Sequence, residues 1–423
     1  MRTRTIAAIF TLLGTTLAAA PRHTMLLREA AAATEAGDQA TFLARLEEAG
    51  RLRPDFPRIL LNLARTYAAQ QRPAEALAAL ARLAAMQLRM AVADDPQLAP
   101  LKDLPRFQAL AAQLDAGPPP AGAADEAAFA ITDVTGIIES CLVDPETLHW
   151  YFGDVRNRCV WHRDISTGGG LLQKFTSDED TLDGVFKIAL SSDRKTLWAA
   201  TATIGVMAGP DAEDGKRSAL VALDFATGRV RARFPVPTDG RKHLLGDFVI
   251  AADGSIYATD SFSPVIWRLP PGGDALEPWL ENQEFLNLQG PAFSGDGRTL
   301  FVADYSNGLW QIDTATKTPT LLTAPANATL FGIDGLYAVP GGLLAVQNGV
   351  NPQRVLRLEP AASGPTAARI VAVGRPAMTD LALGQVFNGR FHFVGDSGWA
   401  LFDPPPATPP AARMVTILST ATE

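Results

Sequence analysis

The chain has 423 residues, of which 47% are hydrophobic and 19% charged, and its formal net charge is -8. This composition is typical of a globular protein, and the length exceeds what one ordinary core accommodates, so we expect at least two units. The acidic balance excludes a general nucleic-acid binder, which needs a basic surface, and there is no long basic run to predict an anionic membrane partner.

Residues 1–20 have the pattern of a secretory signal peptide. Arg2 and Arg4 give a positive start, and residues 6–20 are apolar or small without a charge. This run is shorter than the about 20 residues that span a bilayer, and small residues end it. Pro21 would hinder cleavage directly after Ala20, so we expect the cut one or two residues earlier. The alternative is an uncleaved anchor. The prediction is a periplasmic or secreted protein with no membrane span after cleavage.

Residues 21–115 predict a small all-α domain, because Ala, Leu, Arg and Glu dominate while Gly and Pro fall between the helical stretches. An offset of 34 residues aligns Leu26 with Leu60 and Ala30 with Ala64. Residues 57–77 resemble the helix pair of tetratricopeptide repeats, which have this period. Residues 98–114 predict a closing helix. Two copies are few for a repeat array, so a groove for a protein partner and a structural cap are equally good interpretations.

Residues 116–128 predict a semi-rigid linker containing three consecutive prolines. Residues 129–423 change to short apolar runs of period two, separated by turn residues. One unit of strand, tight turn, strand and an aspartate or a near substitute recurs six times, at residues 139–154, 186–201, 246–260, 289–304, 334–348 and 380–396. The prediction is an all-β six-bladed propeller, whose closed ring leaves few free strand edges.

Cys141 and Cys159 are the two cysteines, and both fall in the first predicted blade. We place them on its first and third strands, whose backbones are about 9.5 Å apart when neighbouring strands are about 4.8 Å apart. A disulfide needs Cα atoms closer than about 7 Å. We therefore expect two buried free thiols, although an exported protein can form disulfides.

The recurring units resemble the gluconolactonase and regucalcin family of six-bladed propellers, chiefly through residues 251–260 and 293–304. The resemblance covers about residues 130–405. It implies a divalent cation, Ca²⁺ or Zn²⁺, at the mouth of the central channel, held by residues at the starts of innermost strands. In that family the ligands are a glutamate in the first blade, asparagines in two middle blades and an aspartate in a later blade.

In this chain the equivalent ring position holds Glu139, Phe186, Gly246, Gln289, Asp334 and Asp380. The resemblance therefore implies Glu139 and Asp334 as metal ligands, whereas Gln289 and Gly246 depart from the two asparagines. Asp247 is a further candidate ligand, but consecutive strand residues point to opposite faces, so the backbone before it would have to twist. Asp380 is better explained as a turn residue, because its register is uncertain.

Two candidate catalytic residues follow from the same alignment. Asp334 is a candidate base beside the cation, and His243, three residues before Gly246, has the reference pKa of a general base. An exposed loop histidine is the favoured alternative for His243. A second recurring set we interpret as structural, since Asp and Asn accept hydrogen bonds from backbone N–H groups of the following turn: Asp154, Thr201, Asp260, Asp304, Asn348 and Asp396.

Two functional hypotheses remain open. The first is an exported, lactonase-like hydrolase that opens a small-molecule lactone or ester with metal assistance. The second is a non-catalytic propeller that binds a ligand or protein while the helical repeats hold another partner. The hydrolase is the leading hypothesis, and the loss of both asparagines is the observation that motivates the second; the fold alone does not decide between them because propellers host many functions.

Overall fold

The computed structural model describes residues 20–122, 127–164, 172–177, 179–209, 213–361, 366–404, 406, 408 and 410–423. All of the predicted signal peptide except Ala20 lies outside these residues. The chain forms two compact units, one of residues up to 86 with Met90–Asp115, and one of Gln87–Arg89 with Ala116–Glu423. No helix in the described ranges is both long and apolar enough to cross a membrane.

The first unit is helical. Its elements are α1 (Arg22–Glu35), α2 (Gln39–Leu52), α3 (Pro57–Ala69), α4 (Pro73–Ala85), η1 (Pro96–Leu101) and α5 (Pro105–Ala116). Proline stands at the start of α3 and of α4, where its missing N–H costs no hydrogen bond. Helices α1 and α2 pack as one pair, and α3 and α4 as another.

The 34-residue offset has a physical basis in this unit, because the positions it aligns are all buried: Leu26, Ala30, Leu60 and Ala64. The predicted closing helix is divided into a 3₁₀ turn and a separate helix. Pro105 explains the break, because proline cannot donate the helical hydrogen bond and disfavours helical backbone in the residue before it.

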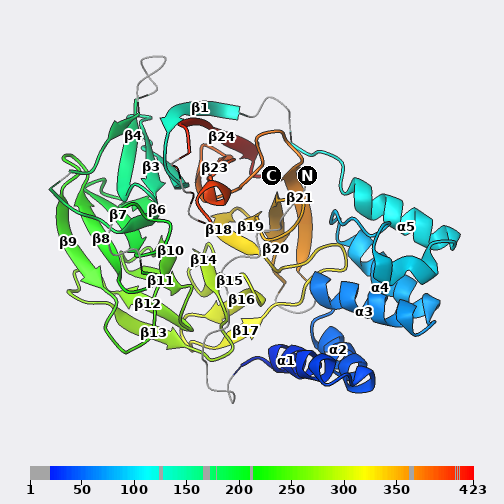
Figure 1. The fold of residues 1–423 in the computed structure, drawn as a ribbon. Coiled ribbons are helices and arrows are strands. Elements are labelled where there is room, and N and C mark those ends of the chain that lie inside the picture. The colour runs from blue at the N-terminus through cyan, green and yellow to red at the C-terminus, as the bar shows by residue number, and fades with distance from the viewer. Residues whose placement is uncertain are drawn as a thin grey trace. The chain divides into compact units, whose positions relative to one another are not determined.

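The second unit is a propeller of six four-stranded sheets, which follow one another around a ring (Figure 1). Blade 1 contains β2 (Ile138–Val143), β3 (Trp150–Asp154), β4 (Cys159–Arg163) and β5 (Gln173–Lys174). Blade 2 contains β6 (Gly184–Leu190), β7 (Thr196–Ala202), β8 (Ser218–Asp224) and β9 (Val230–Pro235). Blade 3 contains β10 (Leu245–Ile250), β11 (Ile256–Asp260), β12 (Val265–Leu269) and β13 (Glu277–Glu281).

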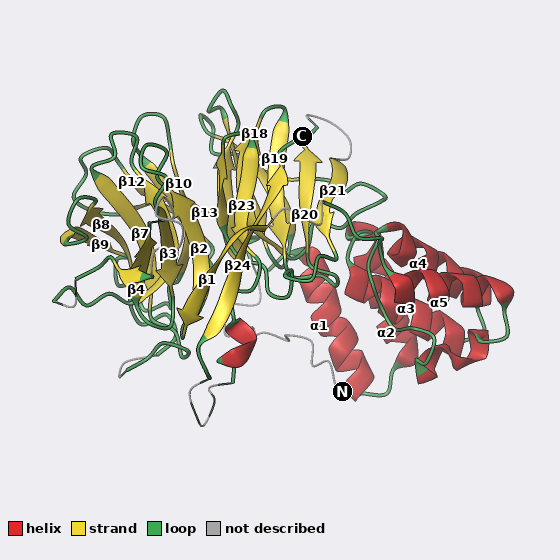
Figure 2. Ribbon diagram, turned by 90° about the horizontal axis from the view of Figure 1, so that it is seen from above, coloured by secondary structure: helices red, strands yellow, loops and turns green. Residues whose placement is uncertain are grey.

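Blade 4 contains β14 (Leu288–Phe293), β15 (Thr299–Asp304), β16 (Gly308–Asp313) and β17 (Pro319–Leu321). Blade 5 contains β18 (Ile333–Val339), β19 (Gly342–Gln347), β20 (Arg354–Glu359) and β21 (Ala367–Val373). Every described strand belongs to this unit, and the short η2 (Trp399–Leu401) is its one described helix (Figure 2). The predicted fold class, a six-bladed propeller preceded by helices, is confirmed.

Blade 6 closes the ring with strands from both ends of the unit. Its order is β1 (Ala127–Val134), β24 (Arg413–Ala421), β23 (Arg390–Val394) and β22 (Gly384–Phe387). The outermost strand β1 pairs antiparallel with β24, so that Ile131 faces Val415. The backbone hydrogen bonds of this pair fasten the first residues of the propeller to the last ones, and a closed ring has fewer free edges.

Aromatic side chains fill the spaces between blades. Trp267 of blade 3 packs with residues of blade 2, and Trp310 of blade 4 packs with residues of blade 3. The cysteines lie on β2 and β4 with β3 between them, and both are buried free thiols, as predicted.

Candidate functional site

A backbone irregularity recurs at the start of the innermost strand in blades 1 to 5. The pairing register shifts at Glu139, Phe186, Gly246, Gln289 with Gly290, and Asp334. These are β-bulges, in which two residues of one strand oppose one residue of its partner. The bulged residues are those of the predicted ring position. Since a bulge interrupts the strict alternation of side chains, the residue after each one is also free to turn toward the axis.

Five side chains from these bulges form what we call the axial cluster: Glu139, Lys187, Asp247, Gln289 and Asp334. The carboxyl groups of the cluster are close enough to change one another's pKa. Loss of water raises the pKa of Glu139 well above its ordinary range, and the neighbouring Asp334 raises it further. Burial, followed by the charge of Asp247, raises the pKa of Asp334 to about 7. The structure thus brings three of the predicted ligands together on the axis.

Each carboxylate of the cluster already has a protein partner. Glu139 accepts a hydrogen bond from the indole Nε1 of Trp399, and Asp334 Oδ2 accepts one from Asn348 Nδ2 at 2.8 Å. Asp247 Oδ1 lies 3.4 Å from the ammonium Nζ of Lys187. The second oxygen of Asp247, Oδ2, has no hydrogen-bond partner among the described residues, although this side chain is only 2% exposed.

These residues do not fit a divalent cation. Ca²⁺ takes six to eight oxygen ligands at about 2.3–2.6 Å. Gly246 supplies no side-chain oxygen, and Gln289, which donates its Nε2 to Asn287 Oδ1 at 2.8 Å, can offer only its Oε1. In the described part of the chain, no group of three or more His, Cys, Asp or Glu side chains is placed to hold a metal ion. The predicted cation therefore stays a prediction without support from this geometry.

His243 is placed between two carboxylates. Its Nδ1 lies 2.6 Å from Asp260 Oδ2, and its Nε2 lies 2.9 Å from Asp239 Oδ1. Burial lowers its pKa, but the hydrogen bonds and charges of these two aspartates outweigh that effect, so the pKa is raised overall. An imidazole with both nitrogens engaged has no free lone pair for a substrate, and we leave His243 out of the proposals below.

Three members of the second recurring set, Asp154, Asp260 and Asp304, accept backbone hydrogen bonds as predicted, whereas Asn348 donates to Asp334 and to Leu381 O. Asp260 accepts hydrogen bonds from the backbone N–H groups of Leu244, Phe262 and Ser263 and from Trp267 Nε1. Asp154 and Asp304 bind flanking backbone and a blade tryptophan in the same way. Each of these carboxylates joins the loop before its blade to the turn after the second strand.

The mouth of the channel, where the innermost strands begin, carries an apolar group that we call the mouth plug: Phe186, Ile204, Phe262, Trp399 and Phe402. These side chains belong to one hydrophobic cluster, and the rings of Phe186 and Trp399 are 6.3 Å apart. Asp380 holds Trp399 in place by accepting its backbone N–H at 2.8 Å. Asp380 is thus a turn residue, and the plug covers Glu139 from the side on which a mouth ligand would enter.

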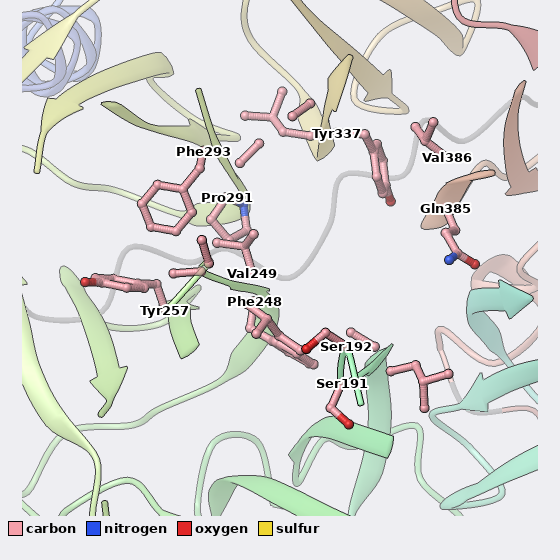
Figure 3. Close-up of a pocket in the computed structure, with 18 of the residues that line it drawn as sticks. Ser191, Ser192, Phe248, Val249, Tyr257, Pro291, Phe293, Tyr337, Gln385 and Val386 are labelled. Carbon is pink, nitrogen blue, oxygen red and sulfur yellow. The ribbon is translucent and has the colours of Figure 1, made fainter. Parts of the chain in front are cut away.

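The opposite end of the channel widens into what we call the axial funnel, a cavity of about 1130 Å³ lined by all six blades. Its wall includes the apolar and aromatic residues Phe248, Tyr257, Pro291, Phe293 and Tyr337 (Figure 3). Ser191, Ser192 and Gln385 add polar groups. Because β6 runs from the mouth toward the turn at Ser191, Lys187 is the deepest residue that β6 contributes to this wall.

Sequence reasoning missed the three residues that shape this site most. Lys187 is the only charged residue in the apolar strand Gly184–Leu190, which is the signal that could have found it. Trp399 and Gln385 carry no comparable signal, because neither stands in a recurring position of the blade pattern.

No protein-family model and no curated protein matches the chain. Among similar solved structures, the calcium-binding protein regucalcin from Agrobacterium tumefaciens is 12% identical with a TM-score of 0.47, covering 72% of this chain and 95% of its own. A protein provisionally described as a gluconolactonase is 16% identical with a TM-score of 0.45, covering 72% and 100%. A streptogramin B lyase is 15% identical with a TM-score of 0.44, covering 63% and 80%.

These similar structures include the regucalcin and gluconolactonase propellers that the sequence resembles. At such identities the likeness concerns the fold alone. The TM-scores are too low for an argument about residues or activity, so the proposals below rest on the geometry of this chain.

Proposed function

We propose that the propeller binds a small molecule in the axial funnel. The observation that carries this proposal is one cavity of about 1130 Å³, built by all six blades, with the Lys187–Asp247 ion pair at its inner end. Ligand sites typically combine an apolar wall of about 300–1,000 Å³ with a few polar groups that fix orientation. A lactone or ester with an apolar body suits such a wall, and its oxygen atoms suit the ammonium of Lys187.

A substitution that fills the funnel with a larger side chain tests whether the ligand binds there. Ala338 on β18 is exposed and lines the wall, whereas Ala226 is equally exposed in the β8–β9 turn outside it. We expect Ala338→Trp to weaken the best ligand from a panel of lactones, esters and their open-chain acids at least tenfold by titration calorimetry. The matched variant Ala226→Trp should bind as the wild type does. Equal binding by all three proteins would place the ligand elsewhere.

Hydrolysis of a lactone or ester is the second candidate function. It is supported by the convergence of Glu139, Asp247 and Asp334 on the axis, where the raised pKa values of these carboxyl groups suit proton transfer. The test is turnover of the same panel, with and without added Ca²⁺ or Zn²⁺. Turnover that survives Asp334→Asn and Glu139→Gln would exclude these carboxyl groups as catalytic residues.

Export and a partner for the helical unit belong to the same proposal. The charged start and apolar run of residues 1–20 support periplasmic or secreted localisation. Cell fractionation and N-terminal sequencing test it, and an intact Met1 in the cytoplasmic fraction would refute it.

The paired helices α1–α4 support a protein partner, because repeat helices commonly present a binding groove. Crosslinking in cells with and without residues 21–115 tests that part.

A further inference from the structure

The axial cluster contains an internal cation where the resemblance implies a metal. Lys187 follows the bulge at Phe186, just as Asp247 follows the bulge at Gly246. Both bulges interrupt the side-chain alternation, and both residues turn toward the axis, where Nζ and Oδ1 are 3.4 Å apart. Lys187 is only 8% exposed. A buried ammonium is stable only if surrounding groups compensate for its lost water.

Three blades supply that compensation. Asp247 of blade 3 gives the ion pair, and the ring of Tyr337 in blade 5 lies 4.8 Å from Lys187 Nζ, within the range of a cation–π contact. The positive charge of Lys187 also favours the ionised forms of Asp334 in blade 5 and of the Cys141 thiol in blade 1, and so partly offsets the rise that burial causes in the pKa of each group. The ammonium of Lys187, which belongs to blade 2, therefore lies near side chains from blades 1, 3 and 5.

The departures from the family ligand set agree with this placement. Gly246 removes one oxygen ligand, and Asp247, the residue that could have replaced it, is turned to Lys187 instead. A divalent cation among these carboxylates would lie close to the ammonium, and like charges at such distances repel strongly when they are shielded from water. The second oxygen of this carboxylate, Asp247 Oδ2, is buried without a hydrogen-bond partner, as are Ser140 Oγ and Asn348 Oδ1.

We propose that Lys187 Nζ is the resident cation of the channel, that the protein binds no divalent metal there, and that removing the ammonium creates a divalent-cation site. The carboxylates of Glu139, Asp247 and Asp334 would then face one another without a positive charge, and a hard cation with oxygen ligands would relieve the repulsion. This inference does not depend on the ligand of the funnel.

The experiment compares wild-type protein, Lys187→Met and the surface control Lys195→Met after removal of metals with a chelator. Each is titrated with Ca²⁺ by calorimetry and by thermal unfolding. We expect no binding by the wild type or Lys195→Met. Lys187→Met should unfold at a lower temperature and regain roughly 5 °C when Ca²⁺ is at about 100 times its Kd. Adding Asp334→Asn to Lys187→Met should abolish that gain.

Two results would overturn the proposal. The first is a Ca²⁺ site in the wild type that Asp334→Asn removes, because the ammonium would then coexist with the metal. The second is a Lys187→Met protein that Ca²⁺ does not stabilise. If Lys187→Met does not fold, Lys187→Gln takes its place in the titration, and the wild-type measurement alone still decides whether a metal is bound.

Discussion

The hydrogen bond from Trp399 to Glu139 gives the sharpest prediction for the channel. Trp399→Phe keeps an aromatic ring against Phe186 but removes the indole N–H that Glu139 accepts. Glu139 is only 8% exposed, so its oxygen cannot turn to water instead. A buried polar group left without its partner costs about 1–3 kcal/mol, and more if the group is charged. We expect the propeller to lose about that much stability.

A double-mutant cycle isolates this contact. Urea unfolding, followed by circular dichroism, is measured for the wild type, Trp399→Phe, Glu139→Met, which has no acceptor oxygen, and the double variant. Residues that contact each other show coupling of about 0.5–3 kcal/mol, whereas independent sites add to within about 0.3–0.5 kcal/mol. Additive effects of the two substitutions would refute the reasoning, because Trp399 would then stabilise the mouth through packing alone.

Three further predictions concern buried residues outside the axial cluster. Asp260→Ala should destabilise the propeller by about 3–5 kcal/mol in the same urea assay, because it leaves several buried donors unpaired, whereas the exposed Asp274→Ala should change stability by less than about 0.5 kcal/mol. Burial, and secondarily the charge of Arg53, lowers the pKa of His23 from 6.5 to about 4. The unfolded chain therefore binds the proton more readily, so the helical unit should lose up to about 3 kcal/mol as pH falls from about 6.5 to about 4, and His23→Gln should flatten that profile in thermal unfolding. Both thiols should resist a thiol reagent until the protein unfolds, since they are buried and burial raises the pKa of Cys141 to about 12; fast reaction of either in the native protein would contradict this.

The repeat pattern predicted the fold because the same physical requirement recurs in each unit. Leu26 and Leu60 are buried at equivalent positions, and the aspartates at 154, 260 and 304 bind equivalent turns. The strand β1 was not foreseen as the outer strand of blade 6, because its position depends on pairing with β24, almost 290 residues away in sequence. The division of the closing helix follows from Pro105, because a proline at that position disfavours helical backbone in the residue before it.

The metal-binding and catalytic roles implied for the axial cluster stay predictions, whereas the structure shows where its side chains lie. Glu139, Asp247, Gln289 and Asp334 all reach the axis or its rim, and the bulges supply the twist that Asp247 needed. The assumption of strict alternation along each strand concealed Lys187, because it assigned the residue after Phe186 to the opposite face. The ammonium then changed the chemistry of the whole ring, which no alignment of ring positions alone could show.

The most direct measurement of the central claim, a ligand site on the channel axis that works without metal, is binding of the best panel ligand with and without a chelator. The account predicts the same Kd in a chelator and in excess Ca²⁺, and a weaker Kd for Ala338→Trp under both conditions. Binding that disappears in the chelator and returns with Ca²⁺ would contradict it.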